Sequence, residues 1–122
     1  MIVAGFGCRA GATAASLHAA LVVASEDHVA TMLAIPADRL AIARPLADAL
    51  DLPLVGIATN ALAAIVTPTR SRASLAARGT GSVAEAAALA AAGRGARLLT
   101  SRRISPDRMA TCALAISQDI PA

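Results

Sequence analysis

Five short apolar runs alternate with alanine-rich helical patterns along this 122-residue chain, and that alternation limits the fold more than any other feature. The apolar runs have the length of buried strands, whereas the alanine-rich segments place their larger apolar side chains at helical spacing. Strands that alternate with helices form α/β domains in which both faces of the sheet are covered. We therefore predict a single domain over residues 1–122, a three-layer α/β/α sandwich with a mixed sheet of about five strands.

The predicted elements follow from these patterns and from the turn residues between them. Strands are expected at 2–6, 29–35, 54–58, 97–102 and 109–116, and helices at 13–25, 38–50, 61–66 and 82–92, with one or two turns at 71–77. Pro45 lies inside the second helical pattern, so this helix begins either at Asp38 or near Arg44. Asn60 is expected to cap the third helix. The last two strands are expected to form an antiparallel hairpin at one side of the sheet.

Composition restricts both the core and the classes of partner. Phe6 is the single aromatic residue, so Leu, Ile, Val and Ala must fill the core. All the cationic side chains are arginines, and they are scattered without aromatic platforms, which argues against nucleic-acid binding. The longest uncharged run, 52–69, is broken by proline and glycine and predicts no membrane span. Cys8 and Cys112 fit no metal spacing, and no secretory signal is recognisable, so we expect a cytoplasmic protein without a metal.

A glycine loop between the first strand and the first helix is the first candidate site. Its residues are Gly5, Gly7, Cys8, Arg9 and Gly11. Backbone N–H groups at a helix start, together with the planar fork of Arg9, favour a carboxylate or phosphate. The spacing differs from the dinucleotide fingerprint, so no nucleotide cofactor is expected. Two alternatives remain open: the glycines only form a tight turn, and Cys8 is either a thiol of lowered pKa or a small packing residue.

A second candidate site lies where the last helix begins, directly after Gly81. Ser82 and Glu85 stand three residues apart at this helix start, which is the pattern of a capping box. In the alternative interpretation Glu85 is a catalytic acid or base. Ser71 lies earlier in the chain, in a polar patch with Arg70 and Arg72. That patch is either a solvated face or a second contact for an anion, and the same two interpretations apply to the pair Arg102-Arg103.

Several of these segments resemble the cobalamin-biosynthesis family of CobE and of the C-terminal domain of CbiG. Residues 3–13, VAGFGCRAGAT, are similar to the family's opening strand and Gly-x-Gly-Cys-Arg-x-Gly loop. Residues 81–93, GSVAEAAALAAAG, are similar to its Ser-Val-(Ala/Ser)-Glu-Ala-Ala-Ala-Leu segment. Residues 96–99 with the strand 113–116 give a third match. The family's Lys-x-x-Glu-like element after the second strand is absent, and only Asp38 and Arg39 stand in its place.

The resemblance implies a part in building the corrin ring of vitamin B12. Precorrins carry acetate and propionate arms, which Arg9, Arg70 and Arg72 could bind together with helix N-termini. The ligand-binding residues implied in this way are Gly5, Gly7, Cys8, Arg9, Gly11, Ser71, Gly81 and Ser82.

Three functions remain open for such a chain. The first is a protein that binds a precorrin or corrinoid intermediate and hands it on. The second is an enzyme of the same pathway, either a hydrolase or deacylase with CbiG-like cobalt-precorrin-5A hydrolase activity or an isomerase, with Glu85 as the catalytic residue and Ser82 or Ser71 assisting. The third is a scaffold that docks onto other cobalamin-pathway enzymes. A homodimer is compatible with each of these functions.

Overall fold

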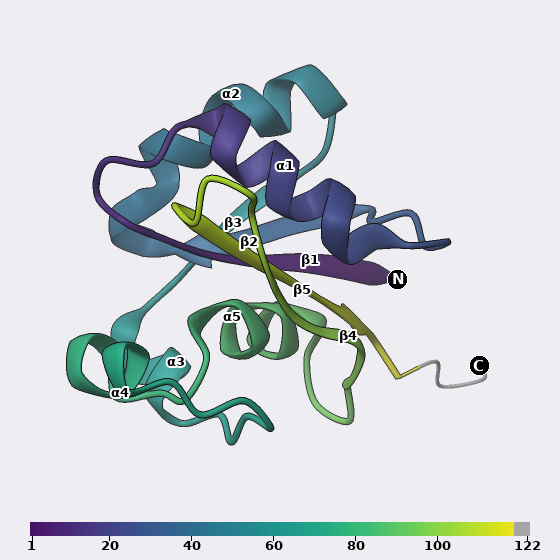
Figure 1. Ribbon diagram of the computed structural model, residues 1–122. Helices are drawn as coiled ribbons and strands as arrows, with labels where there is room; N and C mark the ends of the chain where they lie inside the picture. The colour runs from purple at the N-terminus through teal and green to yellow at the C-terminus, as the bar shows by residue number, and fades with distance from the viewer. Residues whose placement is uncertain (119–122) are drawn as a thin grey trace.

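The computed structural model of the chain describes residues 1–118, so the last four residues of the predicted single domain lie outside the described part. One sheet has the strand order β3-β2-β1-β5-β4 (Figure 1). Its strands are β1 (Ile2–Cys8), β2 (Met32–Pro36), β3 (Leu54–Ile57), β4 (Arg97–Ile104) and β5 (Ala110–Ile116). The first three are parallel, and β5 pairs antiparallel with both β1 and β4. This arrangement confirms the mixed sheet, with the hairpin strand β5 in its interior.

Helices cover both faces of the sheet (Figure 1). One face carries α1 (Ala14–Ser25) and α2 (Leu40–Leu50), and the other carries α5 (Val83–Ala92) with the short α3 (Thr59–Ala63) and α4 (Arg72–Arg78) beyond it. A 3₁₀ turn, η1 (Ala37–Arg39), links β2 to α2. The three-layer sandwich is therefore confirmed.

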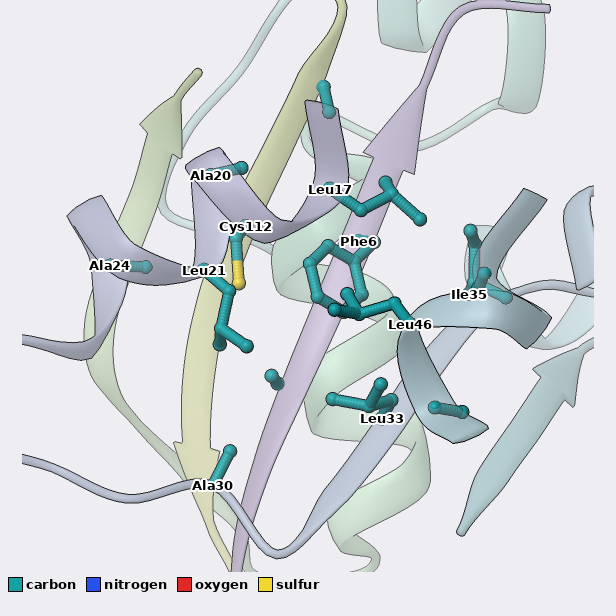
Figure 2. Close-up of a cluster of buried hydrophobic side chains, with 14 of the residues drawn as sticks. Phe6, Leu17, Ala20, Leu21, Ala24, Ala30, Leu33, Ile35, Leu46 and Cys112 are labelled. Atoms are coloured by element: carbon teal, nitrogen blue, oxygen red, sulfur yellow. The ribbon is translucent and has the colours of Figure 1, made fainter. Parts of the chain in front are cut away.

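Small side chains let the layers pack closely. On the α1/α2 face, Phe6 is fully buried among leucines and alanines, including Leu17 and Leu33 (Figure 2). On the α5 face the backbones themselves come into contact. A Cβ atom at Gly5 would overlap the carbonyl oxygen of Ala84 and the backbone nitrogen of Ala88. Gly5 is therefore required for packing, because any side chain would push α5 off the sheet.

The starts of β2, α2 and α3 are among the element boundaries that differ from the sequence-based expectation. β2 begins at Met32 instead of Val29, whose side chain is 77% exposed and lies outside the sheet. α2 begins at Leu40 and continues through Pro45, so the alternative start near Arg44 is wrong. Pro45 and the Ala41 carbonyl that loses its donor are both on the exposed side, where water can replace the missing bond. α3 begins at Thr59, before the expected cap residue Asn60, and has no side-chain cap.

Candidate functional site

The carboxyl ends of β1, β2 and β4 lie at one edge of the sheet, and a cleft of about 550 Å³ opens there. Crevices at this edge are where open α/β sheets bind their ligands. The cleft is completed by α4, the first residue of α5 and the turn of the β4–β5 hairpin. The lining residues are Gly7, Cys8, Arg9, Pro36, Arg39, Ser71, Ala73, Ser74, Arg78, Val83, Arg102, Ile104, Arg108, Met109, Ala110 and Thr111.

All the charged side chains that line this cleft are positive. Five of the lining residues are arginines and none is an Asp or Glu. Within residues 1–118, only Arg78 among these arginines has an ion-pair partner, the carboxylate of Asp38, with nitrogen–oxygen distances of 2.8 and 3.1 Å. The Nε atom of Arg39 is buried and has no acceptor in the same part of the chain. Fixed cations that share a cleft with few counter-charges favour a ligand with several anionic groups.

The arginines of the cleft differ from the set predicted to bind carboxylates. Arg9 lines the cleft as expected, whereas Arg70 and Arg72 do not. Arg39 and Arg108 were not predicted, because one lies in η1 and the other in the hairpin turn, with no shared sequence motif. Only the order of the strands brings these segments to the same edge. Arg102 had been singled out in the sequence as part of the pair Arg102-Arg103, with contact to an anion as one of its two interpretations.

The glycine loop contributes Gly7, Cys8 and Arg9 to the cleft, while Gly5 and Gly11 lie outside its lining. A side chain at Gly7 would overlap its neighbours, because a Cβ atom there would lie 2.8 Å from the Thr111 hydroxyl oxygen. The Arg9 backbone N–H donates to the Met109 carbonyl oxygen at 3.0 Å and fixes the loop to the hairpin turn.

The N-terminus of α1 has a different role from the one expected. Thr13 and Ser16 form a capping box, in which each side chain accepts a hydrogen bond from the other residue's backbone N–H. The backbone N–H groups of Thr13 and Ser16 are therefore already hydrogen-bonded and are not free to bind a ligand, contrary to the expectation for this helix start. Neither residue lines the cleft. Positive charge reaches the cleft mainly through guanidinium groups.

The Cys8 thiol borders the cleft and is half-buried. Burial raises its pKa, and this effect outweighs the opposing influence of the Arg39 and Arg78 charges. The alternative of an activated thiol of lowered pKa is therefore wrong. Burial also raises the pKa of Cys112, which lies inside the core.

The segment 81–85 lies next to the cleft and contributes one residue to its lining. Gly81 lies against the carbonyl oxygen of Thr69, which leaves no space for a side chain. Ser82 caps α5 by accepting a hydrogen bond from the Glu85 backbone N–H at 3.3 Å, as predicted. Both Ser82 and Glu85 are fully buried, and neither lines the cleft. Val83 is the residue of this segment that faces it.

Glu85 does not complete the predicted capping box. Its carboxylate instead accepts hydrogen bonds from the Thr69 backbone N–H at 3.0 Å, the Thr69 hydroxyl at 2.7 Å and the Arg102 backbone N–H at 2.8 Å. These bonds join α5 to β4 and to the loop before α4, both of which provide lining residues. Sequence reasoning missed this role because the donors lie 16 and 17 residues away in the chain.

The hairpin turn is the outer wall of the cleft, and its shape depends on Asp107. That carboxylate accepts hydrogen bonds from the hydroxyls of Ser105 and Ser16, and both bonds lower the pKa of Asp107. Arg108 follows with a left-handed backbone, φ +61°, which is uncommon outside glycine and costs conformational energy. The turn therefore holds a strained residue whose cationic side chain borders the cleft.

No helix within residues 1–118 has the length and apolar character needed to cross a membrane. No group of three or more His, Cys, Asp or Glu side chains is arranged to hold a metal ion in the same range.

Comparison with known proteins gives one family match and several structural matches. The family described as "Cobalamin synthesis G C-terminus" matches residues 2–115. The crystal structure of CobE, a protein from the cobalamin (vitamin B12) biosynthetic pathway, has a TM-score of 0.85 and 33% sequence identity, covering 99% of this chain and 93% of that one. Cobalamin biosynthesis protein chiG from Agrobacterium tumefaciens str. C58 has a TM-score of 0.72 and 35% identity, covering 98% of this chain and 100% of that one.

A more distant structure shares the fold alone. The putative cobalamin biosynthesis protein G homolog from Sulfolobus solfataricus has a TM-score of 0.73 at 18% identity, and the alignment covers 96% of this chain but 37% of that one. No curated protein matches the chain in sequence.

Proposed function

We propose that the arginine-lined cleft binds a precorrin or corrinoid intermediate through the carboxylates of that ligand. The premise is that this chain belongs to the family of the cobalamin synthesis G C-terminus and takes part in cobalamin biosynthesis. The observation that carries the proposal is the cluster of five arginines around one cleft without a lining acid. The acetate and propionate arms of such macrocycles supply the missing counter-charges, and the apolar lining residues Val83, Ile104 and Met109 offer contacts to the ring.

The energetics are sufficient for a carrier. A charge-assisted hydrogen bond contributes roughly 1.5–3 kcal/mol when it is well made. Exposed arginines such as Arg9 contribute less, since solvent screens them. Three or four contacts of this kind, with partial burial of the ring, give an affinity on the order of −8 kcal/mol, which corresponds to micromolar dissociation.

Binding is favoured over catalysis by the position of Glu85. An acid or base must approach within hydrogen-bond distance of the reacting group. The Glu85 carboxylate is fully buried, engaged by Thr69 and Arg102, and outside the cleft lining. A carrier role needs no such group, so the hydrolase or isomerase alternative has no specific observation in its favour.

Spectroscopic titration tests the proposal. Hydrogenobyrinic acid and the octacarboxylate uroporphyrin both absorb visible light, and each should shift its spectrum and be retained with the protein on ultrafiltration at micromolar concentration. Cobinamide, whose arms are amidated, should bind far more weakly. The double variant Arg9→Ala/Arg39→Ala should lose about tenfold or more in affinity, whereas Arg44→Ala, an exposed arginine of α2 outside the cleft, should bind as the wild type does. Equal retention of cobinamide and uroporphyrin, or no retention of either acid, would refute the proposal.

A further inference from the structure

α4 is the least firmly anchored wall of the cleft. Its residues 72–76 and 78 are all exposed or half-buried, so this helix has little apolar packing to hold it. Its start is tied down by a backbone hydrogen bond of 2.6 Å from Ser71 to Gly81. Figure 1 shows α4 beside α3 and apart from the strands. Within residues 1–118, a single pair of hydrogen-bonded side chains joins α4 to another element: Arg78 and Asp38.

That pair has the geometry expected of a bound ligand carboxylate. Both terminal nitrogens of Arg78 donate to the two oxygens of Asp38, which is the bidentate arrangement that a guanidinium forms with any carboxylate. The two side chains are unequally buried, with Arg78 14% exposed and Asp38 60% exposed. Asp38 can therefore turn into water at low cost, while Arg78 stays in the wall of the cleft.

We propose that Asp38 is a specificity-determining residue of this cleft, an internal competitor that occupies Arg78 until a carboxylate of the ligand replaces it. This inference rests on the proposed binding of a polycarboxylate. Replacement exchanges one carboxylate for another at the same guanidinium, so the number of ion pairs at Arg78 is unchanged. The ligand then fastens α4 in place of η1.

The exchange selects for ligands with several correctly spaced arms. Asp38 is held beside Arg78 by the chain and has a high effective concentration there, which a free monocarboxylate cannot match. A ligand already bound by Arg9, Arg39 or Arg102 presents its next carboxylate at a comparable effective concentration. Such a ligand displaces Asp38, and a smaller acid does not. The cleft thereby rejects common metabolites with one or two carboxylates.

A double-mutant cycle with uroporphyrin as the probe tests this role. Asp38→Asn removes the competitor and should tighten uroporphyrin binding about three- to fivefold, the range of a partly exposed ion pair. In an Arg78→Ala background the same substitution should have no effect. Asp48→Asn, an exposed carboxylate of α2 outside the cleft, changes net charge equally and should leave the affinity unchanged in both backgrounds.

Hydrogen exchange on the ligand-free protein supplies a second readout. The amides of α4 should exchange faster in Asp38→Asn than in the wild type or in Asp48→Asn, and uroporphyrin should restore their protection. The inference is overturned if Asp38→Asn tightens binding equally with Arg78 absent, if it fails to tighten binding, or if α4 exchanges at the wild-type rate. These results leave the proposed function standing. Failure of the wild-type protein to bind uroporphyrin and hydrogenobyrinic acid refutes the proposed function, and the competitor role with it.

Discussion

Replacing Glu85 by Gln should destabilise the protein more than an isosteric change usually does. The carboxylate offers two acceptor oxygens to three donors, two of which are backbone N–H groups. A glutamine amide offers one oxygen and one NH₂ group. Whichever way the amide is turned, its NH₂ faces the N–H of either Thr69 or Arg102, and a buried donor remains without an acceptor.

The structure sets the size of this effect. Loss of one hydrogen bond to a charged acceptor costs roughly 1.5–3 kcal/mol, and an unsatisfied buried donor adds about 1–3 kcal/mol. The smaller desolvation cost of a neutral amide offsets part of this sum. We expect a net loss of about 2–3 kcal/mol in the free energy of unfolding, or a Tm lower by about 8–12 °C at roughly 4 °C per kcal/mol.

Thermal and urea unfolding followed by circular dichroism measure the change, with Asp48→Asn as the matched exposed control. The variant should also bind uroporphyrin more weakly, because Glu85 holds the loop before α4 and the backbone of Arg102 at the cleft. A Glu85→Gln protein that melts within about 2 °C of the control would refute this account of the carboxylate. Full binding by a clearly destabilised variant would show that the cleft does not depend on it.

Two further predictions concern the rim of the cleft. Because the pKa of Cys8 is raised, its alkylation by iodoacetamide at pH 7.5 should be slower than that of a free thiol and should accelerate as the pH rises beyond 9. Uroporphyrin should protect Cys8, and Cys112 should stay unmodified in the native protein. Mass spectrometry after digestion measures the labelling, and rapid labelling of Cys8 at neutral pH would contradict the prediction. The variant Arg108→Asn should be as stable as the wild type or up to about 1 kcal/mol more stable, because Asn tolerates the left-handed backbone. It should also bind uroporphyrin more weakly. Unfolding and titration of one sample separate the two effects, and an unchanged affinity would show that Arg108 does not contact the ligand.

The sequence predicted the fold well because local signals and the global arrangement agree. The apolar runs were short, the helices were alanine-rich, and Gly93 and Ser82 marked the ends of α5 where the structure places them. The misplaced start of β2 shows where this reasoning fails. Val29 has a strong preference for strands, but it precedes the point where β2 can pair with β1, and pairing decides the boundary.

The candidate site was less predictable because its charges come from segments with no local signature. Arg39 lies in a 3₁₀ turn and Arg108 in a hairpin turn, and each is unremarkable in sequence. The glycine loop was identified because strand, glycines and helix are contiguous. Glu85 was misinterpreted for the same reason: a neighbour three residues away suggested a cap, whereas its actual donors come from a distant loop and from β4.

The positive charge of the cleft depends as much on where the acidic residues lie as on the arginines. Seven of the eight Asp and Glu residues fall within residues 1–118. Glu85 is engaged by backbone donors and Asp107 by the hairpin turn, while Glu26 pairs with Arg103 outside the cleft. Within residues 1–118, Asp38 alone forms an ion pair with the guanidinium of a lining arginine, and its own side chain is exposed. The other lining arginines have no carboxylate partner within residues 1–118, and for this reason we propose that a molecule with many carboxylates binds at this edge of the sheet better than one with few.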